Sequence, residues 1–354
     1  MQRLRFITAT PLDVRRGSGT FVGIRTLAGA LEALGTEVVF AVPRLRLPVF
    51  TAERLLFNEE LRFRPADGFD AHVGFDMDGY RLGRAAGLRV AALKGVIADE
   101  LRFQKGATRA SMAVQARCEA VHVRRADLVI ATSTYSAGRV RELYGVEAAV
   151  APELIDLEAW RGLLAANPAS PDPSKFTVLC VCRLYRRKRI DVLLRAAARL
   201  AGRIPGLEVR IVGDGPERGE FEWVWREERL GATVRWLGDV PMAGLAAEYN
   251  RSDAFCLPSV QEGFGIVFLE AMAAGKPIVA ARAAAVPEVV PQGLLAEPDD
   301  PASLAECLHR LWREPGLREG LAAAGARRVA QFDAPCVART FLETLAAAGA
   351  NAPR

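Results

Sequence analysis

Residues 257–288 read LPSVQEGFGIVFLEAMAAGKPIVAARAAAVPE, and no other stretch says more about the fold. A short apolar strand ending near Ser259 is followed by the glycine-bearing loop 262–265 and by an apolar helix that contains Glu270. Glycines let a phosphate or a sugar approach the backbone, and the free amides at a helix start favour negative charge. Glu270 follows Glu262 by eight residues, about two helical turns, so both carboxylates can face a ligand at the helix entrance.

Each glutamate also has a purely structural interpretation. Glu262 could be a capping or loop residue, and Glu270 could be solvated. The apolar surroundings of Glu270 in IVFLEAMAA disfavour exposure to solvent, and a buried acid needs a partner. We therefore interpret both glutamates as functional.

Short apolar runs alternate with helical patterns along all 354 residues, which predicts an α/β protein with parallel sheets in two doubly wound, Rossmann-like domains. The proline-rich stretch 167–176 is interpreted as a linker between regular regions. In such sheets ligands bind outside the carboxyl ends of the strands, so we expect an active site that spans both halves. The predicted strands are 4–10, 37–43, 70–76, 89–95, 127–133, 148–153, 177–182, 207–213, 233–238, 254–259 and 277–281.

The charge distribution narrows the range of partners. The net charge of +5 comes entirely from residues 1–155, which hold 22 Lys and Arg against 17 Asp and Glu. A nucleic-acid binder is usually more basic and carries recognition motifs, so we expect no nucleic acid. An anionic substrate, a membrane surface and a merely solvated basic face all remain open.

Targeting and cysteine patterns point to the cytoplasm. The amino-terminal residues lack the apolar core of a secretory signal, and no run approaches the roughly eighteen apolar residues of a membrane span. The six cysteines are scattered, without the spacing of a disulfide framework or a zinc site. We expect a cytoplasmic protein with reduced cysteines.

Four further motifs accompany the two glutamates and the Gly-Phe-Gly loop in a fixed order, and together they closely resemble the retaining GT-B glycosyltransferases of family 4 (glycosyl transferases group 1). The motifs are LVIATSTYSAGRVRELYGV (128–146), VCRLYRRKRIDVLLRAAARL (181–200), VRIVGDGPER (209–218) and VRWLGDVP (234–241).

The resemblance implies a GT-B fold, in which two Rossmann-like domains face each other across a cleft. Residues 1–155 would bind the acceptor, and residues 156–333 would bind the nucleotide-sugar donor. A helix over 334–354 would cross back to the first domain.

The family pattern also assigns roles around the loop. Glu270 would bind the nucleotide ribose, and Glu262 would lie beside the transferred sugar. The amides of Gly263, Phe264 and Gly265 would hold sugar hydroxyls or the diphosphate.

Two cations, Arg183 and Lys188, flank a strand-to-helix turn, where they can hold a leaving diphosphate. The resemblance identifies them as the family's phosphate-binding pair. Gly213 and Asp214 form a turn after a strand, which the family places near the nucleotide base, although a structural turn is an equal interpretation of Asp214.

Near the amino terminus Gly17, Gly19 and Gly23 precede a helix. A dinucleotide fingerprint is a weak interpretation, because these glycines do not follow their strand directly and no acid ends the second strand. In the family the same loop, with Gly17 and Gly19, approaches the donor phosphates.

The acceptor side has two candidates, Asp76 and Lys94. Asp76 and Asp78 form a D-x-D pattern, but their place after a strand of a doubly wound domain argues against a metal site, so we expect Asp76 near the acceptor. Lys94 stands where the family often has a sugar-contacting histidine, and Ala284-Ala285 replaces its Gly-Gly.

The expected function is the transfer of a sugar from a UDP- or GDP-sugar to a sugar, lipid-linked or small-molecule acceptor. Transfer would be same-face and independent of metal and cofactor. The alternatives are a catalytically silent nucleotide-sugar-binding subunit and, less favoured, a nicotinamide-dependent oxidoreductase. In VPRLRLPVFTAERLLF (42–57), arginines alternate with apolar residues, which fits either peripheral contact with the inner membrane face or a helix packed on its own domain.

Overall fold

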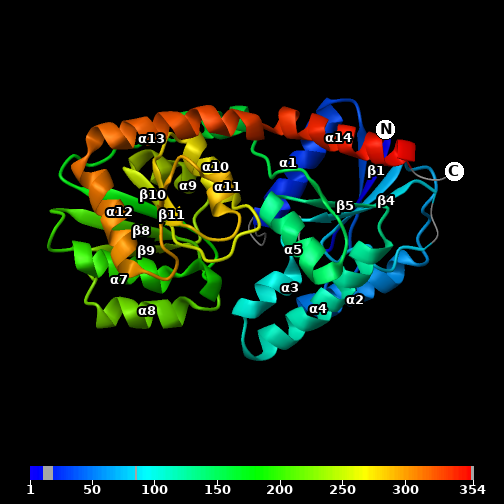
Figure 1. The fold of residues 1–354 in the computed structure, drawn as a ribbon, viewed down its shortest axis with the longest axis horizontal. Coiled ribbons are helices and arrows are strands. Elements are labelled where there is room, and N and C mark those ends of the chain that lie inside the picture. Colours follow the sequence, from blue (N-terminus) through cyan, green and yellow to red (C-terminus); the bar gives the residue numbers. More distant parts are fainter. Residues whose placement is uncertain (11–18, 84–85, 352–354) are drawn as a thin grey trace. The chain divides into compact units, whose positions relative to one another are not determined.

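The structure is a computed structural model that describes residues 1–10, 19–83 and 86–351. The chain divides into two compact units (Figure 1). Unit 1 comprises Met1–Leu154 and Ala334–Arg354, and unit 2 comprises Ile155–Asp333. Each unit contains a six-stranded parallel sheet, which confirms the predicted α/β class.

The sheet of unit 1 has the order β2-β1-β3-β4-β5-β6. Its strands are β1 (Arg3–Ile7), β2 (Glu37–Ala41), β3 (Ala71–Phe75), β4 (Leu88–Leu93), β5 (Leu128–Ala131) and β6 (Ala149–Val150). The helices of this unit are α1 (Gly19–Ala33), α2 (Phe50–Leu61), α3 (Ile97–Glu100), α4 (Gly106–Arg125), α5 (Thr134–Tyr144) and α14 (Ala334–Asn351), with the short 3₁₀ helix η1 (Leu101–Phe103).

The last helix completes the core of unit 1. Val337, Phe341 and Leu345 of α14 are buried in the same apolar cluster as Phe6 and Phe75 of the central strands. In Figure 1 the red α14 lies beside the blue α1, its neighbour from the other end of the chain. Burial of this apolar helix face is what holds the carboxyl-terminal segment on unit 1.

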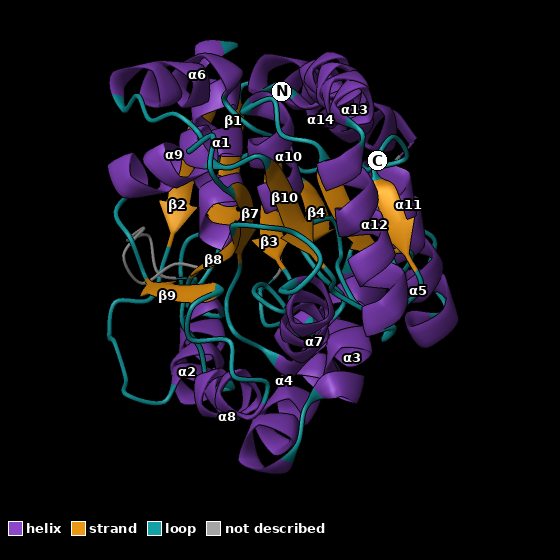
Figure 2. Cartoon of the chain, turned by 90° about the vertical axis from the view of Figure 1, so that its left-hand side faces the viewer, coloured by secondary structure: helices purple, strands orange, loops and turns teal. Residues whose placement is uncertain are grey.

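The sheet of unit 2 has the order β12-β11-β10-β7-β8-β9. Its strands are β7 (Phe176–Val181), β8 (Leu207–Val212), β9 (Val234–Gly238), β10 (Ala254–Leu257), β11 (Ile278–Ala281) and β12 (Leu294–Ala296). The helices, which lie on both sides of the strands in Figure 2, are α6 (Leu157–Ala166), α7 (Ile190–Leu200), α8 (Arg218–Glu227), α9 (Met242–Arg251), α10 (Ile266–Ala273), α11 (Val286–Val289), α12 (Pro301–Arg313) and α13 (Pro315–Arg328), with η2 (Arg186–Lys188) and η3 (Val329–Phe332).

The proline-rich stretch 167–176 connects two regular elements, α6 and β7, as expected, and it lies inside unit 2. One sequence expectation needs correction. The predicted strands omit β12, whose three residues are too short to give a periodic signal.

The strand order reverses once in each sheet, and this reversal locates the candidate ligand sites. In unit 2 the chain runs outward from β7 toward β9 and from β10 toward β12, so the loops after β7 and β10 diverge. In unit 1 the same reversal lies between β1 and β3. Open parallel sheets bind ligands at such points, beyond the carboxyl ends of the strands.

The loop after β11 contains a strained backbone position. Ala284 has φ 50°, in the left-handed region where glycine is favoured. The next residue, Ala285, donates its amide to the carbonyl of Glu262 at 3.3 Å, which fixes this loop against the glycine-bearing loop. The methyl group of Ala284 therefore carries a conformational cost beside a candidate site.

We expect Ala284→Gly to stabilise the protein by about 0.5–1 kcal/mol, because it removes a left-handed alanine. Ala283→Gly is the matched control. Ala283 does not have a positive φ, so its replacement should only add freedom to the unfolded chain and destabilise. The midpoints of urea unfolding measure both effects. Midpoints that shift equally and in the same direction in the two variants would contradict this account.

Candidate functional site

A buried ion pair joins the two diverging loops of unit 2. Lys188, at the end of η2, places its Nζ 2.5 Å from Oε1 of Glu262 in the loop after β10. The two side chains are only 12% and 7% exposed. Arg187 lies 3.7 Å from the other carboxylate oxygen and donates to the carbonyl of Gln261 at 3.2 Å. The topology thus brings together two residues that are remote in the sequence.

The charges around Glu262 decide its protonation. Burial alone would raise the pKa of this carboxyl, but the positive charges of Lys188 and Arg187 outweigh burial and hold the pKa below its ordinary value. Glu262 is therefore a carboxylate at neutral pH, and it can accept hydrogen bonds but cannot act as an acid.

The Gly-Phe-Gly loop presents backbone donors. Gly265 caps α10 with φ 93°, and a Cβ there would come within 2.6 Å of the Phe268 ring. Phe264 is buried, with its ring centroid 5.4 Å from that of Phe332, so its amide is the group available to a ligand. Within the described ranges, the amides of Phe264 and Gly265 donate to no protein acceptor. Together with the first amides of α10 they form a site suited to an anion.

Glu270, on α10, has a different environment from Glu262. Its carboxylate accepts a hydrogen bond from the Tyr249 hydroxyl at 2.9 Å, and its backbone carbonyl accepts one from the Trp160 indole at 3.2 Å. Burial raises the pKa of Glu270 to about 7, against the opposing effect of the Tyr249 hydrogen bond. Glu270 is thus partly protonated near neutral pH.

Arg183 lies on the same loop as Lys188 but is not part of the buried cluster. Its side chain is 47% exposed, and its Nη1 lies 3.9 Å from Oδ2 of Asp239. A pair this exposed contributes little stability, so Arg183 is available to an anionic ligand.

Gly213 and Asp214 have a structural account. A Cβ on Gly213, whose φ is 114°, would lie 2.0 Å from the carbonyl oxygen of Cys182. Asp214 accepts from the Gly215 amide at 2.7 Å and lies 3.4 Å from Arg218. The glycine lets the loop after β8 pack against the loop that carries Arg183 and Lys188, and a nucleotide role for Asp214 stays a prediction.

The candidate residues of unit 1 lie at the carboxyl ends of β3 and β4. Asp76, with φ 54°, accepts from the Lys94 amide at 2.9 Å, and burial raises its pKa to about 6. Lys94 pairs with Glu153 at 2.8 Å, and both side chains are less than 10% exposed. A Cβ on Gly23 would lie 2.5 Å from this glutamate, so the glycine makes room for the pair. Gly17 lies outside the described residues, and Gly19 is the first residue of α1.

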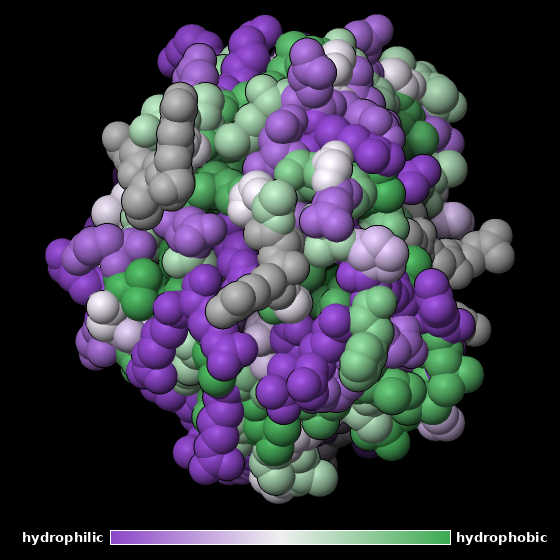
Figure 3. All heavy atoms as spheres, turned by 90° about the vertical axis from the view of Figure 1, so that its right-hand side faces the viewer, coloured by the Kyte–Doolittle hydropathy of each residue, from purple (hydrophilic) through white to green (hydrophobic). Residues whose placement is uncertain are grey.

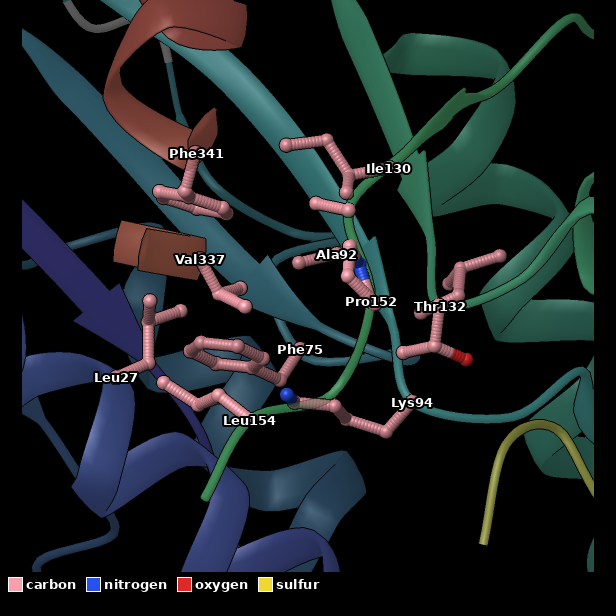
Figure 4. Close-up of a pocket in the computed structure, with 12 residues that line it drawn as sticks. Leu27, Phe75, Ala92, Lys94, Ile130, Thr132, Pro152, Leu154, Val337 and Phe341 are labelled. Carbon is pink, nitrogen blue, oxygen red and sulfur yellow. The ribbon is translucent and has the colours of Figure 1, made fainter. Parts of the chain in front are cut away.

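The side chains behind Lys94 enclose a small cavity (Figure 4). Figure 4 shows the Lys94 nitrogen turned toward Phe75 and Leu154, with Val337 and Phe341 of α14 on the far side. The cavity volume of about 20 Å³ has room for about one water molecule.

The D-x-D residues face different partners. The carboxylate of Asp78 is fully buried and accepts from Arg54 and Asn58, both at 3.1 Å, and from the Ala9 amide at 2.7 Å. Asp76 instead binds the Lys94 amide. In the ranges that the structure describes, no three His, Cys, Asp or Glu side chains converge as a metal site would require.

Sequence reasoning missed three residues that complete these sites. Arg187 has no assigned role in the motif 181–200, Glu153 is only the end of a predicted strand, and Tyr249 belongs to no motif. Each of the three contacts a residue that is far away in the sequence. The spacing of residues within one motif cannot indicate such a contact.

The chain is similar to known glycosyltransferases. Residues 175–314 match the family model of the glycosyl transferases group 1. The D-inositol 3-phosphate glycosyltransferase of Actinosynnema mirum is 36% identical over an alignment of 253 residues, and the alignment covers 64% of this chain and 58% of that protein. This chain thus spans less than two thirds of the length of the curated relatives it matches.

Two solved structures share the whole architecture. The sucrose-phosphate synthase from Thermosynechococcus elongatus has a TM-score of 0.82 and 22% identity, covering 99% of this chain and 100% of that chain. HepE from Anabaena, solved in complex with UDP and glucose, has a TM-score of 0.71 and 19% identity, covering 98% and 99%. The fold is the GT-B fold of glycosyltransferases. Among the described residues, no helix has the length and apolar character needed to cross a bilayer.

The opposite pKa shifts of the two glutamates predict opposite effects of amide substitution on stability. The pKa of Glu270 is raised in the folded protein. The folded state therefore loses stability as the pH rises from the ordinary pKa of a glutamate toward about 7 and Glu270 becomes charged. Glu270→Gln should therefore be more stable than the wild type at pH 8, by on the order of 2–3 kcal/mol, with the gap closing below pH 5.

Glu262→Gln is the contrasting variant. The pKa of Glu262 is lowered in the folded protein, so its charged carboxylate stabilises the fold at any pH above the ordinary pKa of a glutamate. This stabilisation is lost as the pH falls and the carboxylate is protonated. This variant should be less stable than the wild type at pH 8, and the two should converge in acid. Thermal unfolding of all three proteins between pH 4.5 and 8.5 measures both effects, and shifts of the same sign would exclude the assigned environments.

Proposed function

We propose that the protein is a retaining glycosyltransferase that moves a sugar from a nucleotide-sugar donor, a UDP- or GDP-sugar, to an acceptor. The observation that carries the proposal is the Lys188–Glu262 pair beside the free amides of Phe264 and Gly265, at the point where the strand order of unit 2 reverses. The family match over residues 175–314 covers this cluster.

The proposed mechanism rests on stabilising the leaving group. As the bond between sugar and diphosphate breaks, negative charge develops on the diphosphate and positive charge on the sugar. Arg183, Lys188 and the loop amides stabilise the diphosphate, and Glu270 accepts hydrogen bonds from the ribose hydroxyls. Glu262 lies beside the transferred sugar and keeps Lys188 in place.

Transfer to the same face of the sugar is the proposed stereochemistry. The acceptor hydroxyl attacks from the side of the departing diphosphate, whose oxygen takes the hydroxyl proton, so the new bond keeps the original configuration. Protein cations carry the phosphate charge, which makes a metal or other cofactor unnecessary to the proposal.

Unit 1 is the proposed acceptor side. Lys94 and Glu153 offer a donor and an acceptor side by side, and Asp76 adds a carboxyl group, a set that suits hydroxyl-rich molecules. The relative from Actinosynnema mirum is named for D-inositol 3-phosphate, which supports a small hydroxylated acceptor here. A sugar or lipid-linked acceptor presents the same hydroxyl chemistry.

Peripheral contact with the cytoplasmic face of a membrane is a second part of the proposal. Arg54 and Phe57 of α2 are buried in unit 1, so half of the amphipathic segment belongs to the core. The rest is exposed, including Val49 at 63% and Phe50 at 42%, and Phe63 just beyond the helix is 83% exposed. Figure 3 shows hydrophobic and hydrophilic residues intermixed on the face it displays, so any contact would be local.

Two other functions are distinguishable from this one. A catalytically silent nucleotide-sugar-binding subunit would bind UDP or GDP without hydrolysing the donor, although Glu262, Glu270, Arg183 and Lys188 are all present. A nicotinamide-dependent oxidoreductase would bind NAD. Calorimetric titration with UDP, GDP, ADP and NAD, followed by slow hydrolysis of nucleotide sugars, separates the three.

Lys188→Ala should lower hydrolysis of the donor by about a hundredfold, because it removes a positive charge from the transition state. Arg186→Ala is the matched control. Arg186 lies on the same 3₁₀ helix but pairs with Glu217 and Glu220, so its loss should leave turnover close to the wild type. Circular dichroism verifies the fold of both variants. Equal turnover of the Lys188 variant and the control would refute the assignment.

Phe63→Glu should weaken co-sedimentation with anionic vesicles, since it replaces an exposed apolar ring by a charge of the same sign as the lipid. Trp223→Glu, at another exposed aromatic residue on α8 of unit 2, is the control and should bind like the wild type. No binding of the wild-type protein to anionic vesicles at low salt would remove the membrane contact from the proposal.

A further inference from the structure

We propose that Tyr249 is a positioning residue, whose buried hydroxyl holds the Glu270 carboxylate in the orientation that binds the nucleotide ribose. This inference rests on the proposed function, because it takes Glu270 as the residue that binds the nucleotide. It adds a residue from α9 to a site that otherwise consists of the loops after β7 and β10 and of α10.

The hydrogen bonds of Tyr249 support this role. The side chain is fully buried, and its hydroxyl lies 2.9 Å from Oε2 of Glu270 and 3.3 Å from the backbone carbonyl oxygen of Val267. The carbonyl alone would satisfy a buried hydroxyl, so the shorter bond to the carboxylate is an additional feature. A hydrogen bond from a neutral donor to a carboxylate stabilises the charged form and one orientation of its oxygens.

Packing keeps the Tyr249 ring in place. The ring stacks on Phe255 of β10, with centroids 5.9 Å apart and planes 19° apart. On another side it meets the Trp160 ring edge to face, with centroids 5.6 Å apart. Trp160 itself donates to the Glu270 backbone carbonyl at 3.2 Å. The hydroxyl is therefore presented from a rigid aromatic cluster, and such rigidity is what a positioning group requires.

Few titratable groups face this pair. Cys180 of β7 is the other group near Tyr249, and it contributes only to raising the tyrosine pKa. In the part of the chain that the structure describes, Tyr249 is the one titratable neighbour that affects the pKa of Glu270. The Tyr249 hydrogen bond lowers this pKa, while burial raises it to about 7. Nucleotide affinity should thus rise as the pH passes through about 7 and Glu270 becomes charged.

The test compares the pH dependence of nucleotide binding in the wild type and in Tyr249→Phe. Calorimetry from pH 5.5 to 9 uses UDP, or GDP or ADP if that is the nucleotide the wild type binds. Removing the hydroxyl should move the midpoint of the affinity profile upward by about one pH unit, so that affinity falls severalfold at pH 7 and recovers near pH 9. Glu270→Gln supplies the baseline, because its profile contains only the titration of the nucleotide itself. In the double variant, Tyr249→Phe should have no further effect on the midpoint.

Tyr144→Phe is the matched control for loss of a buried hydroxyl. Tyr144 donates to the buried Glu119 in unit 1, so its replacement removes an equivalent bond without touching Glu270. Its affinity profile should superpose on that of the wild type.

A readout without ligand separates failure of this inference from failure of the proposed function. The thermal stability of the wild type should fall as Glu270 ionises, and the midpoint of that fall should also move upward by about one pH unit in Tyr249→Phe. If the nucleotides do not bind but this midpoint moves, the ribose role is wrong. A Tyr249→Phe variant that leaves both midpoints unchanged, or lowers affinity equally at every pH, overturns the positioning role.

Discussion

The ion pair between Lys188 and Glu262 fixes the loops after β7 and β10 of unit 2 to each other. It joins two loops that leave the sheet in opposite directions, and both partners are nearly excluded from water. Desolvation makes such a pair a weak source of net stability, whereas losing one partner leaves an uncompensated buried charge, at a cost of about 3–5 kcal/mol. The pair therefore makes sense as a device that fixes the positions of the loops relative to each other. Arg187 and the Gly263–Gly265 amides are then held beside it in a defined place.

The two glutamates show how one loop and helix provide two kinds of carboxyl group. Glu262 has cations next to it, and its pKa is held below the ordinary value. Glu270 has none, and burial raises its pKa to about 7. Environments that push the pKa values of two neighbouring acids apart are typical of sites that divide chemical roles between them. Under the proposed function, a permanent charge suits Glu262, which would hold Lys188 beside the donor diphosphate, and an adjustable charge suits Glu270, which would bind the ribose hydroxyls.

Local patterns were sufficient for most of the fold and for part of the site. Short apolar runs located eleven of the twelve strands in the described residues, because parallel strands buried on both faces have continuous apolar segments. The glycine-bearing loop was recognisable because its spacing is local. Burial of Arg54 against Asp78 was not predictable, since an amphipathic helix has the same periodicity whether its arginine faces water or a buried acid. Glu153 and Tyr249 were missed for a related reason, because only the folded chain brings them to Lys94 and Glu270.

The two departures from the pattern of the glycosyltransferases that the sequence resembles have different physical meanings. Ala284 introduces a methyl group where the backbone is left-handed, which carries a conformational cost. Lys94 is compensated, because Glu153 neutralises its charge and the absence of a side chain on Gly23 leaves room for the pair. A compensated substitution changes the chemistry of a site without a penalty in stability. In place of a single ring that donates one hydrogen bond, unit 1 presents an ammonium and a carboxylate together, and the two opposite charges of this buried pair balance each other.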